Sequence, residues 1–560
     1  MATTLKLSAA DSAAAYVSPP SSIKHRGKPW NPKSWFSSGP QAELHRQLES
    51  RHMLMLAVGG TIGTGIFLSA GVAVAIAGPG AALLSYILVG IFVYGVVIML
   101  GEMSSLIPTS GGFATFGDRF VDPALGFALG INYYLQWSFS IPSELTAAAV
   151  VLQFWAPEIQ SWVWPLVIIV PIFALQLINV RAYGEMEYWA ALIKVMLICL
   201  FVIVGLLYDW GALDHFVTVP SPGLDNFRNG QAFLGGLGPF LLTFVYAFYS
   251  YGGCELVALA SGEAINPSKT IPKAIKATFF RITLFFVMTI FVIGLCINHA
   301  DPTLLNSDSD SDIAQSPITV VFERAGFGAA KHVVNAVLLT AILSATNSCF
   351  YASSRMMMSL SREGKLPRVM GYVNSRGVPI PALLFTLGIS CLTFLTTIWG
   401  KAVVFTWFLN VTGISALITW ASVAWINVRF RRAFIYQGRS IDDLPYRQPF
   451  YPLLPIVTLF MASIMFIGET YAALKPPFDW RKIFGTYLGL IVFVICYASY
   501  KYIRKTSFVH YGDCDFESDA TWGPGDGQRE RDRVVAKKHN KFAMSMKKHL
   551  RQRKAPLDEA

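Results

Sequence analysis

Runs of about twenty apolar residues recur along this chain, and they constrain its fold more than any other feature. They lie between residues 53 and 502, and each is long enough for a helix to cross a hydrocarbon core of about 30 Å. The composition agrees, since 54% of the residues are hydrophobic and only 14% are charged. Soluble domains carry about a quarter charged residues, so much of this chain cannot face water. The sequence therefore predicts an all-α integral membrane protein.

Twelve spans are expected, and they divide the chain into a membrane core and two polar tails. The expected spans cover residues 53–77, 81–107, 123–155, 162–179, 184–209, 232–263, 277–298, 329–358, 381–398, 402–428, 451–474 and 483–502. The predicted parts are an N-terminal tail (1–52), a ten-helix core (53–428) made of two repeats (53–209 and 232–428), helices 11 and 12 (451–502) and a C-terminal tail (503–560). The first tail has no long apolar stretch, so we do not expect a cleaved signal peptide.

The net charge of +11 is distributed unevenly along the chain. The N-terminal tail and the loops after even-numbered spans carry more Lys and Arg than the loops after odd-numbered spans. The positive-inside rule therefore predicts that both termini are cytoplasmic. The charge is then a topology signal, strengthened by anionic membrane lipid, and not a sign of nucleic-acid binding.

The acidic loop at 299–328 is expected outside the membrane on the opposite side from the termini. Within it, Asn306 stands in an Asn-x-Ser sequence, which is a formal glycosylation acceptor. A plain solvated loop is the alternative.

The residues give no sign of an enzyme, a cofactor or a metal site. The seven cysteines are scattered without a CxxC pair, so neither a disulfide framework nor a zinc site is expected. The sequence also has no paired catalytic carboxylates in a polar domain, no metal-ligand cluster and no nucleophile elbow.

The first span contains four glycines within seven residues, Gly59, Gly60, Gly63 and Gly65. Each glycine weakens a helix by about 1 kcal/mol relative to alanine, so the cluster favours a break. A break within the membrane exposes backbone groups that lipid cannot satisfy, whereas a polar ligand in a cavity could. Two alternatives stay open: a nucleotide loop, although no strand precedes it, and a simple helix-packing motif.

A second interruption lies in span six, where Gly252 and Gly253 are followed by Glu255. Spans one and six would be corresponding members of two five-helix halves, and paired breaks of this kind are typical of inverted-repeat transporters. The half-helix N-termini suit a carboxylate and the opposing carbonyls suit an ammonium group. The pair of breaks therefore predicts a site for a zwitterion.

Ionisable residues inside the spans add candidates, because an unpaired charge there is costly. Lys194 in span five could exchange protons, with a lysine that snorkels near the inner end of its span as the alternative. Glu255 is favoured as functional, Glu144 in span three is balanced between a functional and a structural role, and Glu102 in span two is better explained by a structural ion pair. Tyr249 and Tyr251 lie beside the second break and could line the cavity.

A set of motifs follows in order over about residues 50–450. They are Gly60-Thr-Ile-Gly-Thr-Gly-Ile-Phe67, Glu102-Met, Ile107-Pro-Thr-Ser-Gly-Gly-Phe113, Gly184-Glu-Met-Glu-Tyr-Trp189 before Leu192-Ile-Lys194, Gly262-Glu-Ala-Ile-Asn-Pro267 before Ile271-Pro-Lys-Ala-Ile275, Ser353-Ser-Arg355, Gly364-Lys-Leu-Pro367, and Arg429-Phe-Arg-Arg before Leu444-Pro-Tyr446. The ordered set resembles the fungal amino-acid permease family, the yeast amino acid transporter group of the amino acid–polyamine–organocation superfamily.

The resemblance implies a LeuT-type 5+5 inverted repeat with twelve transmembrane helices, of which helices 1 and 6 are broken. It implies a permease of the plasma membrane that takes up L-amino acids by proton symport, with broad or neutral and basic specificity and with no cofactor. Ubiquitin-ligase adaptors at the cytoplasmic tails are a further implied partner.

The same resemblance implies roles for particular residues. Backbone groups of Ile62, Gly63, Thr64 and Gly65 would hold the substrate carboxylate and amine, and the break at Tyr251 to Gly253 would complete the site. Lys194 matches the lysine that takes the place of the ion in sodium-coupled relatives, so it is the expected proton-coupling residue. Thr412, in Asn410-Val-Thr-Gly413, is expected to influence side-chain preference.

One departure limits what the resemblance implies about selectivity. Relatives commonly read Gln-Gly-Thr-Glu at the second break, where this chain has Gly252-Gly-Cys-Glu255. No particular selectivity is therefore carried over from the family. Two alternative functions also stay open: an amino-acid sensor of transporter ancestry that signals without net transport, and a carrier of related solutes such as polyamines or choline.

Overall fold

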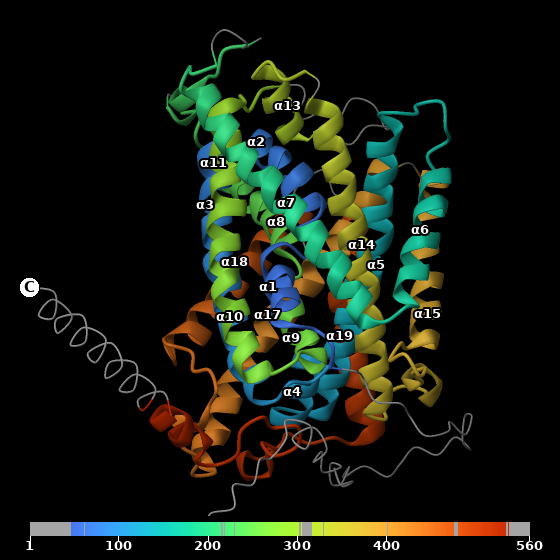
Figure 1. Ribbon diagram of the computed structural model, residues 1–560, viewed down its shortest axis with the longest axis vertical. Helices are drawn as coiled ribbons and strands as arrows, with labels where there is room; N and C mark the ends of the chain where they lie inside the picture. The colour runs from blue at the N-terminus through green and yellow to red at the C-terminus, as the bar shows by residue number, and fades with distance from the viewer. Residues whose placement is uncertain are drawn as a thin grey trace, which may run out of the picture.

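The computed structural model describes residues 46–533, apart from 61, 214–216, 218, 229, 302–303, 305–315, 329, 400 and 475–479, and also residue 536. Within that part the chain is helical, and its strand-like pairing is a single parallel bridge between Leu48 and Ala264. Residues 1–45 of the predicted N-terminal tail, the last part of the predicted C-terminal tail and Asn306 lie outside the described residues. Figure 1 shows long helices side by side in an upright bundle, with α13 (Pro317–Arg324) at one end and α4 (Gly112–Phe120) at the other.

Each predicted span coincides with one helix or with a run of short helical pieces. Single helices are α3 Pro79–Leu106, α5 Pro123–Gln153, α6 Val163–Gln176, α7 Val180–Asp209, α14 Ala330–Arg362, α17 Lys401–Tyr436, α18 Leu453–Leu474 and α19 Trp480–Arg504. The interrupted spans are α1 Ser50–Met55 with α2 Ala70–Ala77, α8 Leu237–Tyr251 with α9 Leu256–Leu259, α10 Pro267–Phe280 with α11 Met288–Cys296, and α15 Ile380–Ser390 with α16 Thr396–Trp399. Among the described residues, eight helical segments are long and apolar enough to cross a membrane. The predicted all-α membrane class is confirmed.

Helices α14 and α17 continue beyond the C-terminal ends that hydropathy predicts. The expected span 402–428 ends eight residues before α17 does, and α14 likewise runs on to Arg362. The added turns are rich in charged residues and carry Arg431, whose side chain is buried by packing within the protein. Hydropathy marks where a helix leaves an apolar medium, whereas the helix itself continues as long as its neighbours support it.

The first span breaks where its glycines cluster. A π-helical turn at Leu56–Gly60 ends the inner piece, Ile62 and Gly63 are not helical, and a second π-helical turn at Gly65–Ser69 leads into α2. A side chain at residue 65 would clash, since a Cβ there would lie 2.4 Å from the Cα of Ser250 in α8. Glycine at this position therefore lets the backbones of the two broken spans touch.

The sixth span breaks directly after Tyr251. Gly252 leaves helical geometry (φ −48°, ψ 142°), and Gly253 has a φ of +85°, which L side chains rarely adopt. The chain then resumes as α9, with Glu255 at its start. Both predicted interruptions are therefore present in the described chain.

Helix α5 packs against both α14 and α17. The side-chain amide of Asn132 in α5 donates to the carbonyl of Ser415 at 2.8 Å and to the hydroxyl of Thr419 at 3.1 Å, both in α17. These buried polar contacts fix the relative positions of two helices that line the cavity described below.

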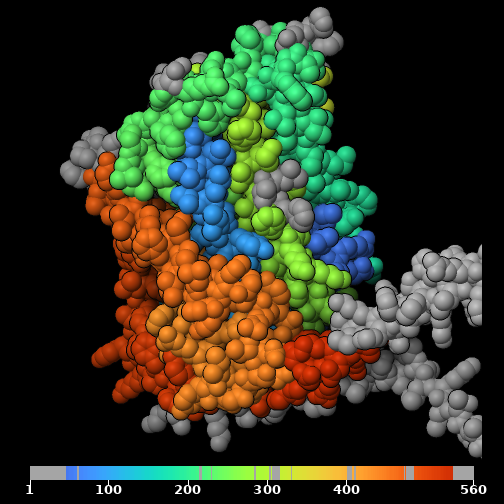
Figure 2. Space-filling view, turned by 90° about the vertical axis from the view of Figure 1, so that its left-hand side faces the viewer, coloured from blue at the N-terminus to red at the C-terminus, as the bar shows by residue number. Residues whose placement is uncertain are grey.

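The segment after α19 lies along the lower end of the bundle in Figure 1. The amide of Thr521 donates to the carbonyl of Leu106 at 2.7 Å, and the amide of Gly527 donates to Asp443 at 3.3 Å. Figure 2 shows this red segment against the orange stretch that leads into α18. The described part of the C-terminal region is therefore docked on the end of the helix bundle.

Candidate functional site

A cavity lies where the two broken spans meet α5, α14 and α17. About 600 Å³ of space, including the open solvent at its mouth, is not filled by atoms here. Its lining residues are Gly63, Gly65, Gln136, Trp137, Ser140, Glu144, Phe248, Tyr249, Ser250, Gly252, Gly253, Ala345, Cys349, Thr412, Gly413 and Ala416. Seven of the residues predicted from the sequence are in this set: Gly63, Gly65, Glu144, Tyr249, Gly252, Gly253 and Thr412.

The first break brings backbone and side-chain groups to one side of the cavity. A Cβ at residue 63 would lie 2.9 Å from a carboxylate oxygen of Glu144, so a side chain there would displace that carboxylate. Ile62 and Thr64 are buried beside it without lining the cavity. The two glycines therefore line the cavity, while the side chain of Thr64 between them binds Glu144.

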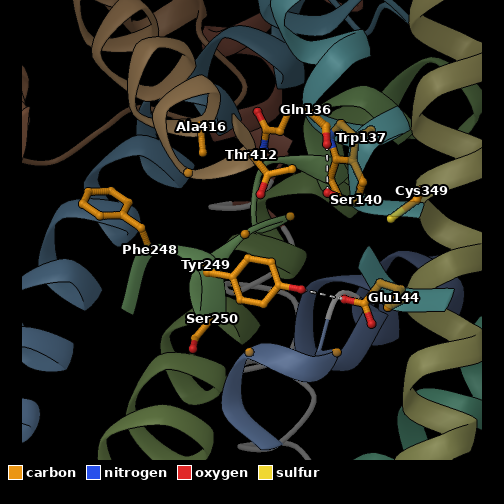
Figure 3. A pocket seen from close by; sticks show the side chains of 16 residues that line it. Gln136, Trp137, Ser140, Glu144, Phe248, Tyr249, Ser250, Cys349, Thr412 and Ala416 are labelled. Atoms are coloured by element: carbon orange, nitrogen blue, oxygen red, sulfur yellow. Dashed lines mark hydrogen bonds between the residues drawn. The ribbon is translucent and has the colours of Figure 1, made fainter. Parts of the chain in front are cut away.

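Glu144 is held by two hydroxyl groups from different spans. Its Oε1 accepts hydrogen bonds from the hydroxyl of Thr64 at 3.1 Å and from that of Tyr249 at 3.4 Å. Those two hydroxyls lie 2.7 Å apart, and Figure 3 shows the Tyr249 side chain pointing across the cavity to Glu144. Oε2 of Glu144 is buried and has no hydrogen-bond partner among the described residues. The site thus contains a carboxylate with spare capacity to accept.

The second break separates residues that the sequence grouped together. Tyr251 is fully buried, and its hydroxyl donates to the carbonyl of Tyr86 in α3 at 2.9 Å, away from the cavity. Glu255 also lies outside the lining, and its Oε2 accepts from the indole of Trp420 in α17 at 3.2 Å. Tyr251 and Glu255 therefore connect the second break to neighbouring helices.

Lys194 is completely buried and contacts the first break. Its ammonium donates to the carbonyl of Gly59 at 3.1 Å and to the hydroxyl of Ser344 in α14 at 2.8 Å. The nearest carboxylate oxygen, on Glu187, is 3.6 Å away. A lysine at this position does not snorkel to the membrane surface, so the structure speaks against that alternative.

Glu187 is a site residue that the sequence reasoning missed. It lies seven residues before Lys194 on α7 and accepts hydrogen bonds from Ser344 at 2.6 Å and from Ser348 at 3.2 Å. A spacing of seven residues puts two side chains on the same face of a helix, and this signal was available in the sequence. A second intramembrane carboxylate that was missed, Glu469 in α18, is buried behind the wall of the cavity near Gly413.

Glu102, in contrast, is the structural ion pair that its position predicted. Arg431 of α17 donates to both of its carboxylate oxygens, and the amide of Gln448 donates to one of them at 2.9 Å. A similar buried pair joins Arg355 to Glu263 at 3.0 Å. Neither pair lines the cavity. Across the described residues, we find no group of three His, Cys, Asp or Glu side chains placed to hold a metal ion.

Comparison with known proteins gives matches over nearly the whole membrane core. A sequence model of the amino acid permease family matches residues 52–511. The chain is 42% identical to the lysine-specific permease LysP of Escherichia coli (strain K12), over 84% of this chain and 96% of that protein. It is 39% identical to the histidine permease HisP of Lactococcus lactis, over 85% and 98% of the two chains. It is also 37% identical to the S-adenosylmethionine permease GAP4 of Candida albicans, over 83% and 76%.

Proposed function

The chain belongs to the amino acid permease family, whose members have the LeuT-type fold and are transporters, not enzymes, and from that premise we propose that it takes up L-amino acids by proton symport across the plasma membrane. The family accounts for amino-acid transport in general. We propose in addition that transport is coupled to protons, that the substrates have a defined range, and that the membrane is the plasma membrane.

One observation carries the proposal: the two broken spans meet at a single cavity. The close approach of Gly65 to Ser250 joins the breaks, and both expose backbone groups where a small zwitterion could bind. A substrate carboxylate would accept from backbone N–H groups at the first break, where Gly63 and Gly65 line the cavity, and its ammonium would interact with backbone carbonyls and with Glu144. Tyr249 and Thr412 would contact the substrate side chain.

Lys194 supports proton coupling through its contact with Gly59. A protonated ammonium links α7 and α14 to the carbonyl of the first break, as the distances above describe. Loss of the proton would remove the charge that strengthens this contact, and Glu187 lies close enough to influence that exchange. Occupation of the substrate site and protonation of Lys194 would then both act on the same short stretch of backbone.

The remaining details of the proposal rest on the sequence. We propose cytoplasmic termini from the distribution of Lys and Arg, two repeats at 53–209 and 232–428, and anionic lipid and ubiquitin-ligase adaptors as partners of the tails. Placement in the fungal group is likewise a proposal, since bacterial and fungal permeases both occur among the relatives. The names of those relatives include lysine and histidine, which fits a range of neutral and basic amino acids.

Uptake in cells that lack their own amino-acid permeases tests the proposal. Radiolabelled amino acids, polyamines and choline would be compared with and without a protonophore. Accumulation of amino acids that collapses with the protonophore is the expected result. Accumulation that ignores the proton gradient would contradict symport, and a signalling response without uptake of any solute would favour the sensor.

A further inference from the structure

One intramembrane carboxylate lies behind the cavity wall without a hydrogen-bond partner among the described residues. Glu469 is on α18, close to the end of the helix at Leu474, and its side chain is only 5% exposed. Its Oε1 is buried and accepts no hydrogen bond from any of the described residues. A lone carboxylate within a membrane span is costly, so it is a functional candidate by default.

A glycine separates this carboxylate from the cavity. Gly413 of α17 lines the cavity, and a Cβ built on it would have Oε1 of Glu469 as its nearest described neighbour, 3.7 Å away. No described side chain therefore stands between Gly413 and the carboxylate. The absence of a side chain at 413 leaves a window through which a ligand in the cavity could reach Glu469.

Glu144 provides a second carboxylate at the same cavity. Its contacts come from hydroxyl groups, and its Oε2 lacks a hydrogen-bond partner among the described residues. Figure 3 shows Glu144 and Thr412, the neighbour of Gly413, entering the cavity from different sides. A ligand with two separated positive charges would interact with both carboxylates, whereas a neutral amino acid supplies only one.

We propose that Glu469 binds the positively charged end of a substrate side chain, so that the cavity is built for cationic amino acids with a long unbranched side chain. The proposal rests on the proposed function and names the substrate class of the same site. The α-ammonium lies at the first break near Glu144, and the side chain extends past Thr412 and through the window at Gly413. A charge-assisted hydrogen bond to Glu469 then holds its ammonium or guanidinium group.

A competition experiment tests this subsite with the full-length protein. Arginine and citrulline have nearly the same shape and differ in side-chain charge, so their ability to inhibit uptake of a labelled substrate isolates the charge. We expect the inhibition constant of arginine to be lower than that of citrulline by about tenfold or more. The reason is that a hydrogen bond between charged groups is about twice as strong as a neutral one. In Glu469→Gln the ratio of the two inhibition constants should fall close to one.

Two further variants make the result decisive. Thr470→Val changes the next residue on α18, whose hydroxyl donates to its own helix at Phe466, and should leave the ratio unchanged. Gly413→Ala places a methyl group in the window at an ordinary contact distance, so it should fold and should lower the ratio in the same direction as Glu469→Gln. Gly413→Ala also provides a test if Glu469→Gln is poorly expressed.

The outcomes separate this proposal from the one before it. No uptake of any amino acid by the wild-type protein would refute the proposed function itself. Uptake with an unchanged ratio in Glu469→Gln, or equal loss of arginine and citrulline binding, would overturn the subsite alone. A wild-type protein that does not distinguish arginine from citrulline would overturn it as well.

Discussion

Buried carboxylates occur in two regions of this molecule, and the regions treat them differently. Towards one end of the bundle, Glu102 and Glu263 each have an arginine within hydrogen-bonding distance. At the cavity, Glu144 is held by hydroxyl groups, and Glu469 has no hydrogen bond among the described residues. Both regions are equally inaccessible to water, since all four side chains are at most 6% exposed.

The difference teaches how a membrane protein uses charge. A carboxylate with a permanent arginine partner joins two helices and has little capacity left for a ligand. A carboxylate without one keeps that capacity at a cost in stability, which a transient cation can offset. The same residue type therefore serves structure in one region and, by our proposals, recognition in the other.

Removal of arginine from the buried Glu102–Arg431 ion pair should have the largest effect, a loss of folding stability. Arg431→Ala leaves Glu102 buried without its cation, and such a change costs about 3–5 kcal/mol. We expect little folded protein, measured as the monodisperse fraction after extraction in mild detergent. The neighbouring Arg432, which is exposed, supplies the control Arg432→Ala. Normal yield of Arg431→Ala would break the comparison, because Glu102 would then not need its partner.

Removal of the ammonium at Lys194 should abolish accumulation, while the hydroxyls of Ser344 and Ser348 remain as hydrogen-bond donors to Glu187. Lys194→Ala deletes the contacts with Gly59 and Ser344, and by our proposal it also deletes the group that carries the proton. The measurement is the ratio of internal to external substrate in vesicles with an imposed pH gradient. Lys273→Ala, at an exposed position on α10, is the control. Concentrative uptake at the wild-type rate would refute Lys194 as the coupling group.

Replacement of glutamate by glutamine should affect substrate affinity at Glu144 and stability at Glu102. Glu144→Gln keeps an acceptor for Thr64 and Tyr249, so stability should change little, while substrate affinity should fall about tenfold because a charged partner of the ammonium is lost. Glu102→Gln should lower the melting temperature instead. Binding would be measured by the substrate concentration that half-saturates uptake. A loss of stability at Glu144 equal to that at Glu102 would remove the distinction between the two regions.

The smallest effect is expected outside the membrane, just beyond α14. Burial alone would raise the pKa of Glu363, but the Lys365 ammonium at 2.8 Å and the Thr115 hydroxyl at 2.6 Å outweigh it, and the pKa is lowered from its usual value. A lowered pKa stabilises the fold above the unfolded pKa of about 4.3, and this stabilisation is lost as the pH falls through the folded value.

Glu363→Gln should therefore lower stability by about 1 kcal/mol at pH 7, and the difference from wild type should shrink as the pH falls below about 4. Thermal unfolding of purified protein across this pH range is the measurement, with Glu158→Gln at an exposed position as the control. A difference that stayed constant with pH would contradict the assignment.

The sequence predicted much of the site but not which neighbours face it. Tyr249 and Tyr251 both lie beside the second break, yet only Tyr249 lines the cavity. Residues two apart on a helix point about 200° apart, so one side chain faces the cavity when the other packs against α3. The orientation of α8 decides which, and that orientation depends on contacts with spans far away in the sequence.

For Lys194, too, the sequence predicted the unusual residue but not its contact. Its position within an apolar span marked it as unusual, and the glycine cluster marked the first break. The contact between its ammonium and the carbonyl of Gly59 joins residues 135 positions apart, and no local pattern predicts it. Glu187 was within reach of prediction, because its spacing from Lys194 places both on one face of α7.

What the sequence determined by itself is local in origin. The length of an apolar run fixes whether a helix can span the membrane, and the density of glycines fixes where such a helix breaks, because both depend on neighbouring residues. The tertiary structure alone decided which buried charges are paired. Glu102 binds an arginine 329 residues away in the sequence, whereas Glu469 lies next to a glycine that lines the cavity. The packing of the helices determines these neighbours.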